Sequence, residues 1–186
     1  MQLFEFVMIL VSIILGLGVT EILAGLGRLL RMRSSIRWFW IHSVFQLGIF
    51  LALLQLWWES WDFRLLTEIT FPQSLILLLG PISVFLIAHL LYPDAADDTD
   101  LRKYYFAQSS LLWGFVVFST VVGTVVKPMA FGAVVLQPDN VSGFLTIPLG
   151  VILAISRSER VHAIAASTIL VVLVLDTILP GYLIAG

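Results

Sequence analysis

Long apolar stretches alternate with short polar ones along the chain. A transmembrane helix needs about 20 consecutive, mostly apolar residues, and most of the chain falls into stretches of this kind. Backbone polar groups that face lipid must be bonded internally, and no alternating pattern typical of a membrane barrel is present, so each stretch is expected to be a helix. We predict an all-α integral membrane protein, a bundle of about six transmembrane helices in a single domain over residues 1–186. The spans are expected at roughly 3–27, 37–58, 72–92, 104–126, 141–156 and 161–184.

The fifth span is expected to be short or interrupted. The stretch around it contains Pro128, Pro138 and Pro148. Its first part, "MAFGAVVLQ", is apolar but too short to cross a membrane, so residues 128–138 are expected to form a re-entrant or interfacial half-helix. Short segments interrupted by Gly or Pro often mark transport sites, although ordinary kinks in membrane helices use the same residues.

Composition places the chain in the lipid bilayer. Of its 186 residues, 60% are hydrophobic and 12% are charged, and the mean hydropathy is +1.04. Soluble domains are about half apolar and about a quarter charged. The formal net charge of −2 gives no basic field for nucleic acid. The absence of cysteine excludes disulfides and thiolate chemistry, and no cofactor is expected.

The distribution of Lys and Arg predicts an orientation. The first, third and fifth loops hold eight such residues, and the second and fourth hold two, Arg64 and Lys127. The positive-inside rule then puts the odd loops in the cytoplasm and both termini outside, and we expect the bacterial inner (plasma) membrane. Aromatic residues mark both interfaces, with Trp57, Trp58 and Trp61 outside and Trp38, Trp40, Tyr104 and Tyr105 inside.

Small residues follow two adjoining stripes of the first helix. One stripe contains Gly16, Thr20, Ala24 and Gly27, and the other contains Gly18, Glu21, Gly25 and Arg28. The remaining arc is expected to face lipid, and it consists of Val11, Leu15, Val19, Ile22, Leu26 and Leu29. Small residues let membrane helices approach closely. The first stripe therefore predicts either helix packing within the chain or contact with a second copy or a membrane partner subunit.

Glu21 is an ionisable residue in an apolar helix, where a charge is costly. It is either one half of a structural pair with Arg28 or part of an ion or proton site with His42 or His89. All three histidines, including His162, are expected in the inner half of the membrane. Histidine titrates near neutral pH and also binds divalent metals, so this layer could relay protons or hold a metal. No HExxH spacing is present, and the metal alternative stays open.

Asp176 is the candidate in the outer half of the membrane. Pro180, four residues later, has no N–H to offer the carbonyl of Asp176. A carboxylate and a carbonyl on one residue suit a hard cation. The alternative is a structural pair between Asp176 and Lys127.

Three functional classes follow from these features. The first is a small transporter or channel for protons, cations or a small solute, for which Glu21, His42, His89 and Asp176 are the site candidates. The second is a non-transporting membrane subunit or scaffold, acting through helix association with itself or a partner. The third, an intramembrane enzyme, has no specific support because neither GxSxG nor HExxH occurs.

Overall fold

The computed structural model of the chain describes residues 3–94, 99–137 and 140–178. The predicted all-α membrane bundle is confirmed, with five helical spans long and apolar enough to cross a membrane and one shorter apolar helix. The elements, in chain order, are α1 Leu3–Arg31, β1 Ile36–Arg37, α2 Trp40–Glu59, the 3₁₀ helix η1 Ser60–Leu65, α3 Phe71–Leu90, β2 Thr99–Asp100, α4 Leu101–Val121, the π-helical segment η2 Val122–Val126, α5 Lys127–Ala130, α6 Val141–Ile155 and α7 Glu159–Ile178.

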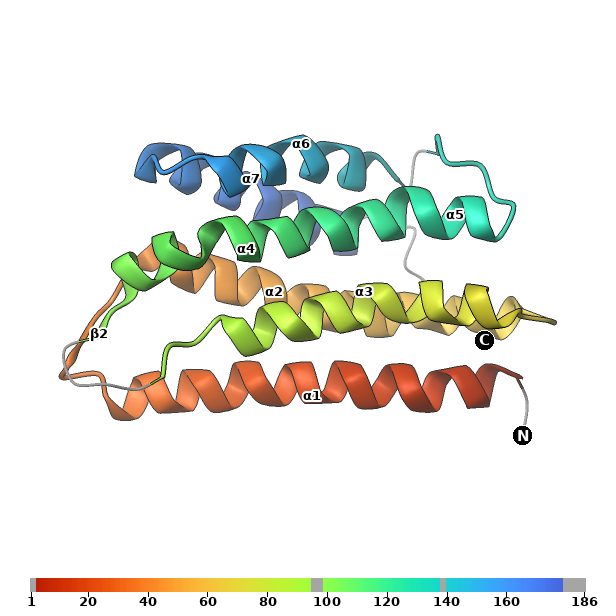
Figure 1. The fold of residues 1–186 in the computed structure, drawn as a ribbon, viewed down its shortest axis with the longest axis horizontal. Helices are drawn as coiled ribbons and strands as arrows, with labels where there is room; N and C mark the ends of the chain where they lie inside the picture. The colour runs from red at the N-terminus through yellow and green to blue at the C-terminus, as the bar shows by residue number, and fades with distance from the viewer. Residues whose placement is uncertain (1–2, 95–98, 138–139, 179–186) are drawn as a thin grey trace.

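The long helices run side by side along one axis (Figure 1) and form a ring. Going around it, α1 packs on α3, α3 on α4, α4 on α6, α6 on α7, α7 on α2, and α2 back on α1. Helix α2 also touches α3 across the ring. Two of these pairs, α1 with α3 and α7 with α2, are not consecutive in sequence, so the ring brings distant segments together.

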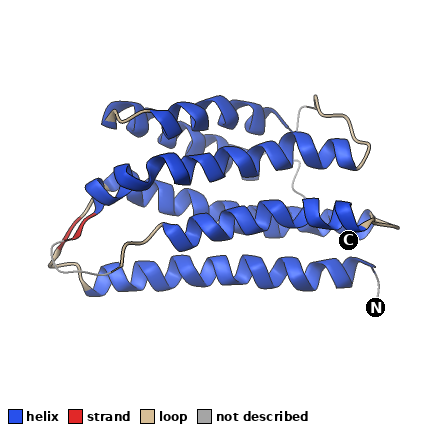
Figure 2. Cartoon of the chain, viewed as in Figure 1, coloured by secondary structure: helices blue, strands red, loops and turns tan. Residues whose placement is uncertain are grey.

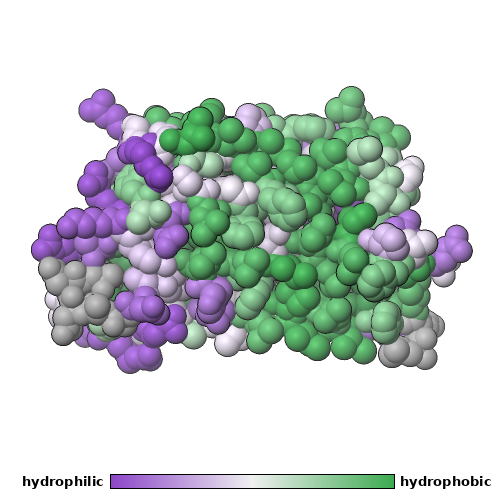
Figure 3. Space-filling view, in the orientation of Figure 1, coloured by the Kyte–Doolittle hydropathy of each residue, from purple (hydrophilic) through white to green (hydrophobic). Residues whose placement is uncertain are grey.

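One end of the bundle, here called the basic end, holds the loops after α1, α3 and α6 with most of the Lys and Arg residues. Figure 3 shows hydrophilic side chains gathered at this end and an apolar surface over much of the rest of the visible face. A parallel pairing of β1 with β2, Ile36 opposite Thr99, joins two of these loops (Figure 2). The sequence analysis did not predict this pairing, because two residues are too few to give a strand pattern. The opposite end, which carries residues 60–70 and 131–137, is called the far end.

Local sequence explains where α3 begins. The Thr70 hydroxyl accepts a hydrogen bond from the backbone N–H of Gln73 at 3.4 Å, and the Gln73 side chain accepts one from the N–H of Thr70 at 2.9 Å. This reciprocal capping box satisfies two donors that a helix start leaves unbonded. The Gln73 amide also donates to the carbonyl of Ala130 at 2.9 Å, so the cap ties α3 to α5 at the far end.

The half-helix expected over 128–138 is not found in the described part of that range, which ends at Gln137. The helix of α4 instead continues through η2 and α5 as far as Ala130. It passes Pro128 because the carbonyl that this proline cannot bond, on Thr124, accepts a 3.4 Å hydrogen bond from the Asn140 amide. Gly132, two residues after the helix ends, has a φ of +68°. The N–H of Ala133 donates to the Pro128 carbonyl at 2.8 Å, the bond of a Schellman motif.

Helix α1 buries much of the arc that was predicted to face lipid. Its larger buried residues are Val7, Val11, Leu15, Ile22 and Leu29, most of them from the arc assigned to lipid. Hydrophobicity cannot separate the two faces, because lipid tails are as apolar as a protein core.

The small residues that do pack belong to the second stripe of α1. A Cβ on Gly18 would lie 2.8 Å from Leu53 of α2, and one on Gly25 would overlap the ring of Tyr92. Of the first stripe, Gly16, Thr20 and Ala24 are exposed and Gly27 is half-buried. The close packing expected there within the chain is therefore not found in the described structure. Contact of this stripe with a second copy or a partner subunit stays a prediction.

The tryptophans expected at the membrane interfaces are exposed. Trp38 and Trp40 near the basic end and Trp57 near the far end each expose about half of their surface. Tyr105 is an exception, because it is fully buried in the bundle. Its ring therefore faces the interior of the bundle, and its hydroxyl serves an internal hydrogen-bond network described below.

Candidate functional site: a cavity inside the helix ring

A cavity of about 290 Å³ lies inside the helix ring. Residues of α2, α3, α4, η2, α6 and α7 line it, together with Val11 of α1. The lining runs from Trp113, near the middle of α4, to Glu59, Lys127 and Asn140 at the far end. The ring topology creates this space, because α6 and α7 close the circle between α4 and α2.

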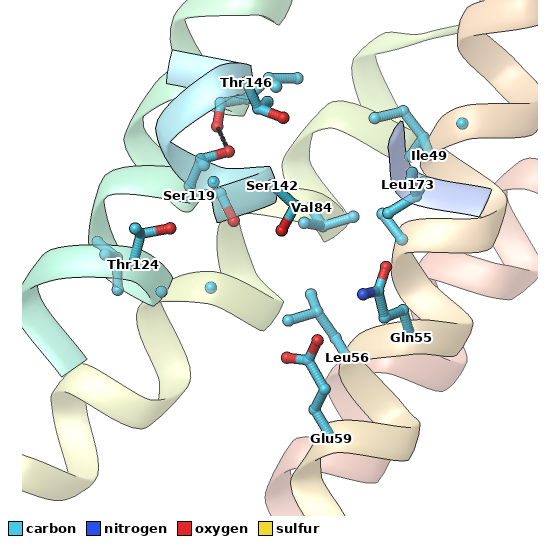
Figure 4. A pocket seen from close by; sticks show the side chains of 18 of the residues that line it. Ile49, Gln55, Leu56, Glu59, Val84, Ser119, Thr124, Ser142, Thr146 and Leu173 are labelled. Atoms are coloured by element: carbon cyan, nitrogen blue, oxygen red, sulfur yellow. Dashed lines mark hydrogen bonds between the residues drawn. The ribbon is translucent and has the colours of Figure 1, made fainter. Parts of the chain in front are cut away.

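The polar lining comes from opposite sides of the cavity. Figure 4 shows Gln55 and Glu59 of α2 on one side and Ser119, Thr124 and Ser142 on the other. These side chains reach toward the space between the helices (Figure 4). Polar groups set in a mostly apolar pocket are the usual means by which a protein orients a small ligand.

Asp176 of α7 joins both sides of this lining. Its Oδ2 accepts a hydrogen bond from the Gln55 amide at 3.0 Å and another from the Ser142 hydroxyl at 3.2 Å. The carboxylate thus links α7 to α2 and α6 within the cavity.

The π-helical turn of η2 shapes the wall formed by α4 and α6. The backbone N–H of Lys127 donates to the carbonyl of Val122, five residues earlier, and this widens the turn. Thr124, in that turn, is buried against Gly143 of α6, where a Cβ would overlap the Thr124 hydroxyl. The absence of a side chain on Gly143 therefore lets α6 approach η2, and Ser142 beside it faces the cavity.

The inner end of the cavity is aromatic and aliphatic. The rings of Phe45 and Trp113 lie 4.7 Å apart, and Ile49, Val84 and Ile87 add aliphatic surface. Helix α3 contributes Pro81, which lacks the N–H for a normal helical bond. A bound molecule would therefore meet apolar surface at the middle of the bundle and polar groups toward the far end.

Between the apolar inner end of the cavity and the basic end of the bundle, buried polar side chains form a chain of hydrogen bonds. The Trp113 indole N–H donates to the Tyr105 hydroxyl at 3.0 Å, and that hydroxyl donates to Nδ1 of His162 at 2.8 Å. Nε2 of His162 then donates to the carbonyl of Ser156 at 3.1 Å. Tyr105 and His162 are fully buried, so the bundle is filled at this level.

The structure brings Glu21 and His89 together but leaves His42 apart from them. Glu21 Oε1 lies 3.3 Å from His89 Nδ1, across the seam between α1 and α3. The two side chains are 31% and 60% exposed, so the pair lies on the outside of the ring rather than in the cavity. His42 is fully buried, and its Nε2 bonds the carbonyl of Leu91 at 2.9 Å. The roles of these residues in an ion or proton site stay predictions.

The carboxylate of Asp176 is the one site candidate that lines the cavity. Pro180, on which the expected carbonyl site also depends, lies outside the described residues. The ammonium of Lys127, the expected alternative partner, lies 5.1 Å from the centre of the Phe63 ring, and Lys127 lines the same cavity.

Sequence reasoning missed Gln55, Glu59 and Ser142. Gln55 had a signal, because it is a lone amide in the apolar run "FLALLQLWW". Ser142 had none, because a serine near a helix start is ordinary. In residues 3–94, 99–137 and 140–178, no group of three or more His, Asp or Glu side chains is placed to hold a metal ion.

Comparison of the chain with protein-family models, curated proteins and solved structures found no match. The geometry and chemistry of the cavity are therefore the basis for inferring function.

Proposed function

We propose that this protein is a small membrane transporter that binds its solute in the cavity inside the helix ring. The cavity carries the proposal, because it combines an apolar floor with polar groups from several helices. Ionisable residues within membrane helices commonly mark the paths of ions and substrates, and Asp176 is such a residue. A protein that only filled the membrane would gain stability by packing this space with side chains.

A transporter fits this geometry better than an open channel. The cavity reaches the far end at Glu59 and Lys127 but stops at Phe45, Ile87 and Trp113, short of the buried network around Tyr105. Between these residues and the basic end, Tyr105 is fully buried and hydrogen-bonded on both sides. A site that is accessible from one side at a time is what alternating access requires.

The predicted orientation in the membrane indicates which side the cavity faces. With the basic end in the cytoplasm, by the positive-inside rule, the cavity faces the outside of a bacterial inner membrane. Both termini then lie outside. In this proposal the cavity belongs to an outward-facing state, and transport requires the layer around Tyr105 to open.

Reconstitution into liposomes tests the proposal. Flux of protons, alkali cations and small organic solutes would be measured for the wild type and for Gly80→Leu. A side chain at Gly80 would grow into the cavity, where the nearest atom to its Cβ is the Ser119 hydroxyl at 4.0 Å. Gly114→Leu is the matched control, because a Cβ there meets nothing within 4 Å and Gly114 lies on the exposed face of α4. We expect flux that Gly80→Leu abolishes and Gly114→Leu retains.

Two outcomes would contradict the proposal. One is the absence of flux for every class of solute in liposomes that hold folded protein. The other is flux that Gly80→Leu and Asp176→Asn both leave unchanged. Glu21→Gln is tested in the same liposomes, since a loss of proton flux would place a proton site at the seam between α1 and α3.

The scaffold alternative has one observation of its own, the exposed stripe of Gly16, Thr20 and Ala24. The Thr20 hydroxyl donates to the Gly16 carbonyl at 2.9 Å, so the stripe presents a small surface without an unsatisfied donor. A second copy or a partner helix could approach such a surface closely. Gly16→Leu should then convert an oligomer to a monomer, as measured by light scattering after size exclusion. A wild type that is already monomeric would argue against self-association.

A further inference from the structure

The lining of the cavity carries more negative than positive charge. Among the described lining residues, the charged groups are the carboxylates of Asp176 and Glu59 and the ammonium of Lys127. Two negative charges and one positive charge leave a net charge of −1. Charges act strongly on one another where protein and lipid keep the effective dielectric constant low. A positive group that enters the cavity is therefore favoured over a negative one.

The positive group of the lining is already engaged with an aromatic ring. The Lys127 ammonium lies 5.1 Å from the centre of the Phe63 ring, within the range of a cation–π contact. This contact holds the charge beside Phe63, at the edge of the lining. The carboxylate of Asp176, by contrast, is positioned from two other helices by Gln55 and Ser142.

The apolar floor excludes a bare metal ion as the main ligand. Hard cations need several oxygen ligands around one point, and the described residues hold no cluster of three acidic or histidine side chains. The inner part of the cavity is instead formed by Phe45, Trp113 and aliphatic neighbours. A volume of about 290 Å³ also exceeds what a dehydrated ion needs, and it suits an organic molecule.

We infer that the cavity binds a small organic cation, an ammonium group carried on an apolar body. The inference depends on the proposed function and names its substrate class. The ammonium lies at the level of Asp176 and Glu59, where the carboxylates balance its charge. The apolar body extends toward Trp113 and Phe45, whose rings form the floor.

Four probes with a common benzyl group test the charge preference. They are benzyltrimethylammonium, neutral benzyl alcohol, anionic phenylacetate and zwitterionic phenylalanine. Binding to the purified protein in lipid nanodiscs would be measured by titration calorimetry, with empty nanodiscs as the blank. We expect benzyltrimethylammonium to bind at least about tenfold more tightly than the other three. Equal affinities, or tighter binding of phenylacetate or phenylalanine, would overturn the inference.

Substitution of the carboxylates locates the effect in the cavity. Asp176→Asn and Glu59→Gln should each weaken binding of the cation by about tenfold, because each removes one negative charge from the lining. Binding of benzyl alcohol should not change. Asp62→Asn is the matched control, since Asp62 is an exposed carboxylate at the same end that does not line the cavity. A cation affinity that falls as much in the control as in the cavity variants would refute the assignment.

The outcomes separate this inference from the proposed function. Cation binding that depends on Asp176, without flux of the same cation in liposomes, would leave the site in place and remove the transport role. Flux that Gly80→Leu blocks, without preference for the cation, would leave the transporter and remove the substrate class. If Asp176→Asn fails to fold, Glu59→Gln carries the test, because Glu59 contributes the other carboxylate of the cavity lining.

Discussion

At the scale of single residues, one network of buried polar groups is bonded across helices. The hydroxyl of Tyr105 accepts from Trp113 and donates to His162, which in turn donates to the Ser156 carbonyl. A buried polar group without a partner is costly, so such a network fixes how α4 and α7 meet. The same network forms the layer that closes the cavity from the basic end.

Tyr105→Phe should destabilise the protein strongly. The change leaves the Trp113 indole N–H and Nδ1 of His162 buried without a partner, at a cost of about 1–3 kcal/mol for each group. Thermal unfolding in detergent, followed by circular dichroism, measures the loss. Tyr104→Phe is the control, because the Tyr104 hydroxyl is half-buried and serves one carbonyl, that of Leu90. Equal losses for the two variants would show that the network adds nothing.

Asp100 gives a prediction for pH dependence outside the membrane spans. The backbone N–H of Lys103, and that of Arg102, donate to its carboxylate and hold its pKa below the ordinary range. A lowered pKa in the folded state means that the ionised group stabilises the protein at neutral pH. This contribution is lost as pH falls through the lowered pKa. Asp100→Asn keeps a capping oxygen but does not titrate.

We therefore expect the wild type to melt at a higher temperature than Asp100→Asn at about pH 7, and the difference to vanish in acid once the pH has fallen below the lowered pKa of Asp100. Melting temperatures of both proteins across this range provide the measurement. A difference that is constant with pH, or that grows in acid, would contradict the role of the carboxylate as the cap of α4.

At the scale of elements, α1 shows how small residues decide which helix faces meet. Gly18 and Gly25 lie where Leu53 and Tyr92 come close, and Tyr92 also donates a 2.9 Å hydrogen bond to the Ile22 carbonyl. Gly16 lies on the same helix with nothing near its missing Cβ. Glycines of one helix therefore differ in role according to the face on which they lie.

Gly25→Ala should destabilise the protein by about 1–3 kcal/mol, because the new methyl group overlaps the Tyr92 ring and forces it to move. Gly16→Ala should leave the stability of the protomer unchanged or raise it slightly, since alanine favours a helix more than glycine does. Unfolding in detergent compares the two variants. The opposite order would show that the first stripe, rather than the second, packs within the chain.

At the scale of the whole molecule, the ring topology separates the bundle into two unlike halves. The half near the basic end is filled by aromatic and polar side chains around Tyr105 and His162. The half near the far end contains the cavity with Asp176 and Gln55. This asymmetry between a filled region and a region with a cavity is the basis of the proposed transport.

The orientation of the two halves can be measured directly, because the chain has no cysteine of its own. Single cysteines at Ser34, near the basic end, and Thr67, near the far end, replace exposed residues. In intact cells, an impermeant thiol reagent should label Thr67→Cys and leave Ser34→Cys unlabelled until the membrane is opened. The reverse pattern would invert the orientation, and with it the side to which the cavity opens.

The sequence by itself determined the class of fold and the approximate helices. A lipid-spanning segment must be apolar over its whole length, and such a segment can be recognised from the local sequence. Proline and charge patterns likewise indicated a short fifth span, and α6 has 15 residues. Of the cavity lining, the sequence singled out Asp176 and Lys127, because charged residues stand out in an apolar chain.

Only the tertiary structure decided which faces and which residues meet. The buried face of α1 could not be predicted, since apolar side chains are equally favourable against lipid and in a protein interior. Gln55 and Asp176 are 121 residues apart and bond because α2 and α7 are neighbours in the ring. Glu21 likewise lies beside His89 rather than His42, because α3 lies along α1. The order of helices around the ring depends on all the contacts together, so no local pattern encodes the cavity that the ring encloses.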